Sequence, residues 1–139
     1  MYTKPMLSLD QCLAAINAMV ADFNKDPNRR PVDMSIVDDA GNLLAYARMD
    51  RCMRPSFGQR KAYTAAIRRM DSVAFAEWLS SRNMTIESIG DPNLITLQGG
   101  LVVVNPSDGI ILGGIGVGGL PTGKEDEDIA RAGLAAMNL

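Results

Sequence analysis

The sequence predicts an α+β fold in which helices pack against an antiparallel sheet. Two segments alternate apolar and polar residues on either side of a turn, which is typical of β-hairpins. The other segments carry apolar residues at helical spacing. The expected order is helix, hairpin, helices, hairpin, helix, which favours helices packed on antiparallel strands. Because no repeat or linker divides the chain, we expect residues 1–139 to form a single domain.

The first helix and the first hairpin occupy the N-terminal third of the chain. Ser8 is suited to be a helix N-cap, and the apolar positions that follow one helical face are Leu7, Leu13, Ile16, Val20 and Phe23. A polar loop covers residues 24–30. The strand patterns "PVDMSIVDD" and "LLAYARMD" then flank "AGN", so we expect a hairpin that turns at Gly41.

The rest of the chain predicts more helices around a second hairpin. Residues 57–81 are helical in pattern, with a break near Asp71, and their small residues (Ala62, Ala65 and Ala66) favour close packing on a sheet. Residues 84–98 are irregular because Gly90 and Pro92 interrupt them. Residues 99–119 form the second hairpin, with its turn at "NPSDG", and residues 125–137 form the last helix.

The stretch "GGIGVGG" contains the G-x-G-x-x-G spacing of a dinucleotide-binding loop. The helix after it opens with "EDED", and these carboxylates would repel a pyrophosphate at the helix N-terminus. We therefore interpret Gly114, Gly116 and Gly118 as one bare face of a strand. Two explanations remain open for that face. Either an alanine-rich helix packs on it, or a flat ligand or a neighbouring subunit does.

Composition excludes several classes of function. The chain has no histidine, which removes Ser-His-Asp and Cys-His catalysis, most zinc sites and a proximal histidine for haem. A net charge of −2 with scattered Lys and Arg argues against nucleic acid as a partner. We expect Cys12 and Cys52 to be free thiols. No apolar segment has the length of a membrane span or the character of a secretory signal, so we expect a cytoplasmic protein.

Several motifs together resemble the GlcG/HbpS-like family, also called DUF336, the haem-degrading family that includes the C-terminal domain of PduO corrinoid adenosyltransferases. They are "VDDAGNLLAYARMD", "KAYTAA", the paired glycines before the second hairpin, "GGIGVGG" and "DEDIARAGLAAM". The resemblance covers nearly the whole chain. It implies a profilin-like fold, with an antiparallel sheet of about five strands and helices on both faces. It also implies a homo-oligomer and a setting in a catabolic operon.

The resemblance assigns roles to individual residues. The residues that match family motifs are Arg48, Met49, Asp50, Lys61, Thr64, Gly99, Gly100 and Asp126. Gly118 departs from the pattern, because the family usually has serine there. Some members bind haem or cobalamin-related ligands. Since histidine-ligated members cannot be the template for this chain, we expect no cofactor, with haem or a corrinoid kept as the alternative.

The candidate site combines the family positions with the chemistry of the side chains. We assign Lys61 and Asp126 as candidate catalytic residues, because a partly desolvated lysine can bind a carboxylate or act as a base. The candidate ligand-binding residues are Arg48, Arg51, Lys61, Thr64, Gly99, Gly100, Gly116 and Gly118. Structural alternatives remain open: Lys61 is a surface residue or forms a salt bridge with Asp50 or Asp126, and Asp126 is an ordinary N-terminal helix charge. The carboxylates form no pattern that predicts a metal site.

Three functions follow from these observations. The first is a small-molecule-binding accessory protein of a catabolic pathway, which holds an organic acid between sheet and helix. The second is an isomerase, tautomerase or hydrolytic enzyme acting on a small organic acid. The third is a haem- or corrinoid-binding protein that uses a ligand other than histidine. The sequence does not identify the ligand.

Overall fold

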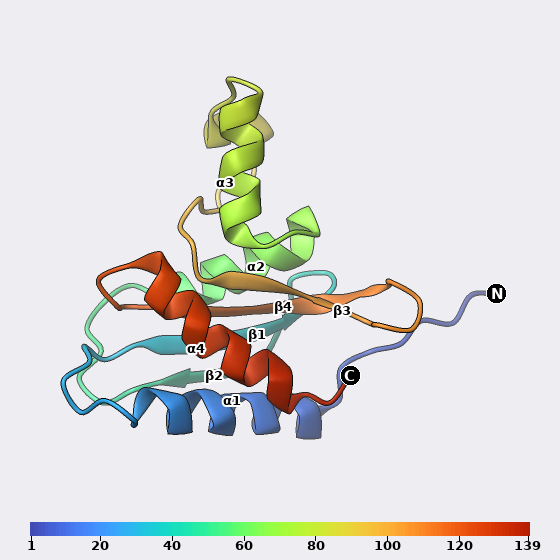
Figure 1. Ribbon diagram of the computed structural model, residues 1–139. Coiled ribbons are helices and arrows are strands. Elements are labelled where there is room, and N and C mark those ends of the chain that lie inside the picture. The colour runs from blue at the N-terminus through green and yellow to red at the C-terminus, as the bar shows by residue number, and fades with distance from the viewer.

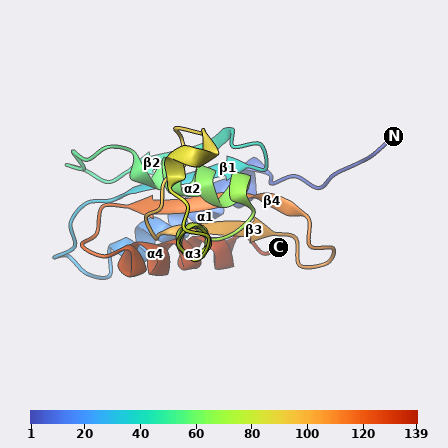
Figure 2. The same cartoon turned by 90° about the horizontal axis from the view of Figure 1, so that it is seen from above.

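A computed structural model describes all residues, 1–139, and confirms the α+β class. Four antiparallel strands form one sheet in the order β2-β1-β4-β3. Helices α1 and α4 cover one face of the sheet and α2 covers the other, while α3 projects away from it (Figures 1 and 2). The elements are α1 (Leu9–Phe23), β1 (Asp33–Asp38), β2 (Leu43–Arg48), α2 (Phe57–Arg68), α3 (Ser72–Ser81), the 3-10 helix η1 (Ile86–Ile89), β3 (Gly100–Val104), β4 (Ile111–Gly118) and α4 (Gly123–Ala136).

The sheet has one strand fewer than the family resemblance implied. The segment between α3 and β3 forms η1 and an irregular loop. This segment contains Gly90, which ends η1 in the left-handed conformation, and Pro92, which cannot donate to a strand ladder. The sheet therefore ends at β3.

Helix α1 begins as the sequence predicts, and every predicted apolar position except Leu13 lies in or against the core. Ser8 and Gln11 form a capping box, in which each side chain accepts a hydrogen bond from the other's backbone. The residues buried in the core are Cys12, Ala15, Ile16 and Met19. Leu13, which the periodicity places in the core, is 47% exposed, because the sheet and α4 lie against a neighbouring stripe of the helix.

The main core lies between the sheet and the α1–α4 layer. It includes Met34 and Ile36 from β1 and Ile115 and Val117 from β4, all fully buried. These residues alternate along their strands with those that face α2. The sheet is thus apolar towards α1 and α4, whereas β4 presents bare backbone towards α2.

Helix α2 fills the glycine face of β4, which decides between the two explanations left open by the sequence. A Cβ atom on Gly114 would overlap the carbonyl oxygen of Ala62, and one on Gly116 would overlap that of Gly58. Ala62 and Ala66 are fully buried against the sheet. The close approach of helix and strand therefore explains the glycines, and no room remains there for a flat ligand or another subunit.

The break between α2 and α3 covers the outer edge of β3. Arg69 ends α2 in the left-handed conformation, and the chain turns at Asp71. The Asp71 side chain then accepts a hydrogen bond from the backbone N–H of Val102, and the Ser72 hydroxyl accepts one from that of Gly100. Two outward-facing donors of this edge strand are thus satisfied within the protein.

Candidate functional site

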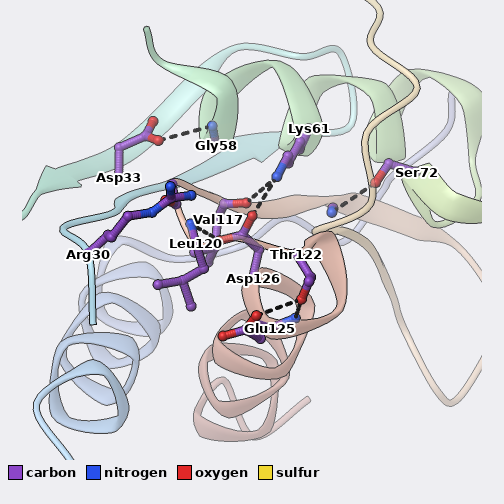
Figure 3. Close-up of polar contacts among 12 residues, drawn as sticks. Arg30, Asp33, Gly58, Lys61, Ser72, Val117, Leu120, Thr122, Glu125 and Asp126 are labelled. Atoms are coloured by element: carbon purple, nitrogen blue, oxygen red, sulfur yellow. Dashed lines mark hydrogen bonds and ion pairs between the residues drawn. The ribbon is translucent and has the colours of Figure 1, made fainter. Parts of the chain in front are cut away.

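A small pocket lies where the end of β4, the first turns of α2 and the N-terminus of α4 meet (Figure 3). Its volume is about 270 Å³. It is lined by Arg30, Arg54, Phe57, Lys61, Leu97, Gln98, Gly119, Leu120, Pro121, Gly123 and Asp126. Both candidate catalytic residues predicted from the sequence therefore lie in one pocket.

Lys61 extends from the sheet-facing side of α2 towards the first turn of α4. Its ammonium Nζ donates to the carbonyl oxygen of Val117 at 2.9 Å and to Oδ2 of Asp126 at 2.9 Å (Figure 3). The side chain is only 3% exposed. Gly99 makes this position available, because a Cβ atom there would lie 2.9 Å from Nζ. Of the alternatives left open by the sequence, the salt bridge to Asp126 is the one that forms.

Asp126 connects three parts of the pocket. Its Oδ1 accepts a hydrogen bond from the backbone N–H of Leu120 at 3.0 Å, while Oδ2 receives Lys61. Thr122 caps α4 one turn earlier by accepting from the N–H of Glu125. Burial raises the pKa of the Asp126 carboxyl, and the opposite charge of Lys61 only partly offsets this rise. The carboxylate therefore fixes the loop before α4 against α2.

A second buried carboxylate, Asp33, lies beside the start of α2 and was not predicted from the sequence. Its Oδ1 accepts a hydrogen bond from the N–H of Gly58 at 3.2 Å, while Oδ2 has no partner. The residue is 1% exposed, and burial raises its pKa. Its negative charge also contributes to the raised pKa of Asp126. The sequence pattern places Asp33 on the polar face of a half-exposed strand. It is buried because α2 packs over that face.

The predicted arginines do not reach the pocket. Arg48 is held outside it, where its guanidinium donates to the carbonyl oxygens of Cys52 and Arg54 and to the Ser56 hydroxyl. Arg51 is exposed in the same loop, with a left-handed backbone. The guanidinium groups that line the pocket belong to Arg30 and Arg54. The "RMD" motif thus organises the loop that carries Arg54.

The remaining predicted ligand residues have packing roles. The Thr64 hydroxyl donates to the carbonyl of Arg60 and accepts from the N–H of Ile95, which fixes the loop before β3. A Cβ atom on Gly100 would overlap the backbone of Lys61. Gly116 lies under α2, and Gly118 lies against Phe57 and Gly58. None of Thr64, Gly99, Gly100, Gly116 and Gly118 lines the pocket, although Gly99 touches the end of Lys61.

Sequence reasoning missed three of the charged residues that matter here: Arg54 in the loop after β2, and Arg30 and Asp33 near the start of β1. The last two share one short segment. The segment "RRPVD" places them on either side of Pro31 at the start of β1, and this end of the strand adjoins Gly118 and Gly119 of the β4 end. A positive charge at the start of one strand and a lysine on a distant helix share no sequence signal. Their proximity depends on strand pairing.

The sequence and the fold together identify the family. The family model for the haem-degrading HbpS-like proteins matches residues 7–135. The chain belongs to the HbpS-like family. This confirms the resemblance drawn from the motifs, and the four-stranded sheet with α1, α2 and α4 is the HbpS-like fold.

Three relatives show the extent of the similarity. Protein GlcG of Escherichia coli (strain K12) is 36% identical over 119 residues, which is 84% of each chain. A double mutant of Streptomyces reticuli HbpS superposes with a TM-score of 0.85 at 34% identity, over 97% of this chain and 89% of that one. The PduOC structure, solved as a haem complex, gives a TM-score of 0.83 at 27% identity over 96% of both chains.

Haem does not fit the pocket of this HbpS-like chain as an axially ligated group. The lining contains no histidine, cysteine, methionine or tyrosine, which are the usual axial donors. Its single amine, Lys61, is already bonded to Asp126 and Val117. The structure also contains no cluster of acidic and cysteine side chains that could hold a metal ion. None of the helices combines the length and the apolar character needed to cross a membrane.

Proposed function

We propose that the pocket beside the Lys61–Asp126 pair binds a small organic anion, and that the protein acts as an accessory binding protein of a cytoplasmic catabolic pathway. The observation that carries the proposal is the excess of positive charge around a partly apolar pocket. Arg30, Arg54 and Lys61 line it against the single carboxylate of Asp126. The catabolic setting rests on the family resemblance.

The two arginines are available to a ligand. Nε of Arg30 donates to the carbonyl of Gly119 at 3.1 Å, which orients the guanidinium and leaves its two terminal nitrogens without a protein partner. The Arg54 side chain forms no hydrogen bond or ion pair. A guanidinium with two free N–H groups matches a carboxylate in a bidentate arrangement. Such a pair favours a carboxylic acid over a neutral ligand.

Lys61 contributes at the base of the pocket. An ammonium group has three donors, and Lys61 uses two of them for Val117 and Asp126. The third donor has no protein partner, and we propose that it donates to a ligand oxygen. Because Asp126 balances the charge of Lys61, the ammonium is fixed in place before a ligand arrives, which lowers the entropic cost of binding.

The size and lining of the pocket favour a small acid. Its volume of about 270 Å³ lies just below the range of roughly 300–1,000 Å³ typical of pockets for drug-sized ligands. Phe57, Leu97 and Leu120 supply apolar contacts beside the charged groups. A ligand with one or two carboxylates and a short carbon chain satisfies both requirements.

A second candidate function is proton transfer on the bound acid, as in an isomerase or tautomerase. The observation that favours it is the raised pKa of Asp126 inside a pocket that also holds Lys61. A carboxyl whose pKa is shifted towards neutrality is suited to exchange protons with a substrate. Haem binding, which the family description and the PduOC complex suggest, is the third candidate, and it would require a binding mode without an axial ligand from this pocket.

Calorimetry with acetate, lactate, malonate and succinate tests the binding proposal. We expect at least one acid to bind, and Arg54→Ala to weaken it about tenfold or more, since a hydrogen bond to a charged group contributes about 1.5–3 kcal/mol. Arg51→Ala is the matched control, because Arg51 is exposed in the same loop but does not line the pocket. If no acid binds, or if both variants bind as tightly as wild type, the proposal is wrong.

Exchange of hydrogen for deuterium separates binding from catalysis. If Asp126 transfers protons, the bound acid incubated in D₂O will gain deuterium at the carbon beside its carboxylate, as followed by NMR. Asp126→Asn should then abolish this exchange. Binding without exchange supports the accessory function instead.

A further inference from the structure

A second pocket lies along the side of α2 that faces away from β4. Its volume is about 360 Å³. It is lined by Gly41, Ser56, Gln59, Arg60, Tyr63 and Asn93. The four lining residues of α2 have the spacing of one helical face, roughly opposite the face of Ala62 and Ala66 that packs on the sheet. This pocket shares no lining residue with the Lys61–Asp126 pocket, so it is a separate site.

One wall of the second pocket is the loop before β3, which side chains of α2 hold in place. Nη2 of Arg60 donates to the carbonyl oxygens of Pro92 and Leu94, at 3.3 and 3.0 Å. The Tyr63 hydroxyl donates to Oδ2 of Asp91 at 2.7 Å. The loop is therefore fixed before a ligand arrives, which lowers the entropic cost of binding.

Another wall is the turn between β1 and β2. The Asp38 side chain accepts hydrogen bonds from two backbone N–H groups of this turn, both at 2.9 Å. Gly41 has a φ of +84°, and a Cβ atom there would lie 2.6 Å from the ring of Tyr63. The turn thus holds the ring at its edge, and Asp91 holds it at its hydroxyl. Tyr63 consequently gives the pocket a flat wall of fixed orientation.

The charges around this pocket nearly cancel. Arg60 is the only charged lining residue, and the carboxylate of Asp91 accepts the hydroxyl of Tyr63 at the pocket wall. A ligand carboxylate would be attracted by Arg60 but repelled by Asp91. In the Lys61–Asp126 pocket, by contrast, three cations surround one carboxylate. The balance of charge in the second pocket therefore favours a neutral ligand.

Two primary amides supply this pocket with donors and acceptors. The side chain of Gln59 is half-buried and forms no hydrogen bond within the protein, and the side chain of Asn93 lies exposed at the rim. A primary amide carries a carbonyl acceptor beside its N–H donors. It therefore pairs best with a ligand edge that also has a donor beside an acceptor. A flat ligand ring can in addition stack on Tyr63.

We propose that the second pocket binds a small, neutral, flat molecule with an amide edge, the chemical class to which nicotinamide and the pyrimidine bases belong. The ring of the ligand packs against Tyr63, and its amide edge pairs with the side chains of Gln59 and Asn93. The volume of about 360 Å³ lies at the lower end of the roughly 300–1,000 Å³ typical of ligand pockets, which suits a molecule with one ring. This site does not depend on the proposed anion site.

NMR titration with uracil and with nicotinamide tests the proposal. We expect at least one of these probes to shift the side-chain NH₂ signals of Gln59 and Asn93. The backbone N–H signals of Leu120 and Gly123, in the Lys61–Asp126 pocket, should stay unchanged. Glucose lacks a flat ring and benzoate carries a carboxylate, so both should bind at the second pocket more weakly than the better probe.

Substitutions in the two pockets identify the binding residues. Gln59→Ala should weaken binding of the probe about threefold or more, because it removes hydrogen bonds to the ligand and none within the protein. Tyr63→Leu should weaken it about fivefold or more, because it removes the stacking surface. Gln98→Ala is the matched control, since Gln98 lines the Lys61–Asp126 pocket, and it should bind the probe like wild type.

Three results would each overturn the proposal. Neither probe shifts the signals of Gln59 and Asn93, or Gln59→Ala binds the probe as tightly as wild type, or glucose or benzoate binds at this pocket more tightly than both probes. Succinate, followed through the signals of Leu120 and Gly123, tests the anion site in the same samples. Either site can therefore fail while the other is retained.

Discussion

Replacing Lys61 by methionine tests whether the buried ion pair is integral to the fold. The change removes the charge but keeps a side chain of similar length, so the cavity effect is small. It leaves Asp126 at 2% exposure without its cation, and the carbonyl of Val117 without a donor. Removing one partner of a buried ion pair costs about 3–5 kcal/mol. For a domain of this size such a loss lowers the melting temperature by about 10 °C or more.

The same variant carries a pH signature. Burial already raises the folded-state pKa of Asp126 above its unfolded value, and the loss of Lys61 raises it further. A carboxyl of this kind favours the folded state when it is protonated. Its contribution is complete below the unfolded pKa and is lost as pH rises through the folded pKa. The deficit of Lys61→Met should therefore be smallest in acid and grow towards neutral pH.

Urea unfolding across this pH range, with a double-mutant cycle, measures both effects. Asp126→Asn retains an acceptor for the Leu120 N–H but removes the negative charge. The double variant Lys61→Met/Asp126→Asn leaves no charge unpaired, so it should lose less than the sum of the two single variants. Lys124→Met is the control, because the Lys124–Asp128 pair is exposed and should contribute at most about 1 kcal/mol. A loss below about 1 kcal/mol for Lys61→Met at neutral pH, or strict additivity, would refute this reasoning.

Three further predictions concern the glycine face, the second buried carboxylate and haem. Gly116→Ala should destabilise the fold by several kcal/mol in urea titrations, because the added methyl group overlaps the Gly58 carbonyl. Gly109→Ala is the control. Its methyl group has no neighbour within 4 Å, so this variant should lose only about 1 kcal/mol of stability, for the left-handed backbone. Burial raises the folded-state pKa of Asp33, so its contribution to the free energy of unfolding falls as pH rises through that pKa. Asp33→Asn should therefore make the free energy of unfolding less dependent on pH in this range. An Asp33→Asn variant with the same pH dependence as wild type would argue against this assignment. Hemin titration should give no sharp Soret band of an axially ligated haem, because the pocket lining offers no usual axial ligand. Tight hemin binding that a single Cys, Tyr or Met substitution abolishes would contradict this conclusion.

Local patterns in the sequence determined most of the secondary structure and the family. Alternating apolar residues predicted both hairpins, and the Ser8 cap predicted the start of α1, because strand alternation and helix capping depend on neighbouring residues. The motifs also selected Lys61 and Asp126, which the structure brings into one ion pair. The motif positions thus showed which charged residues belong to the site, although they did not show which of them contact each other.

Tertiary structure alone decided which charges meet and which faces are covered. Arg30 and Arg54 line the pocket, rather than Arg48 and Arg51, because the loop after β2 turns the Arg48 guanidinium onto carbonyls of its own loop. The periodicity of α1 marked Leu13 as apolar, but only the placement of α4 left it exposed. Such outcomes depend on contacts between segments far apart in the chain, and the energy of a buried charge or a bare strand face is set by what packs against it.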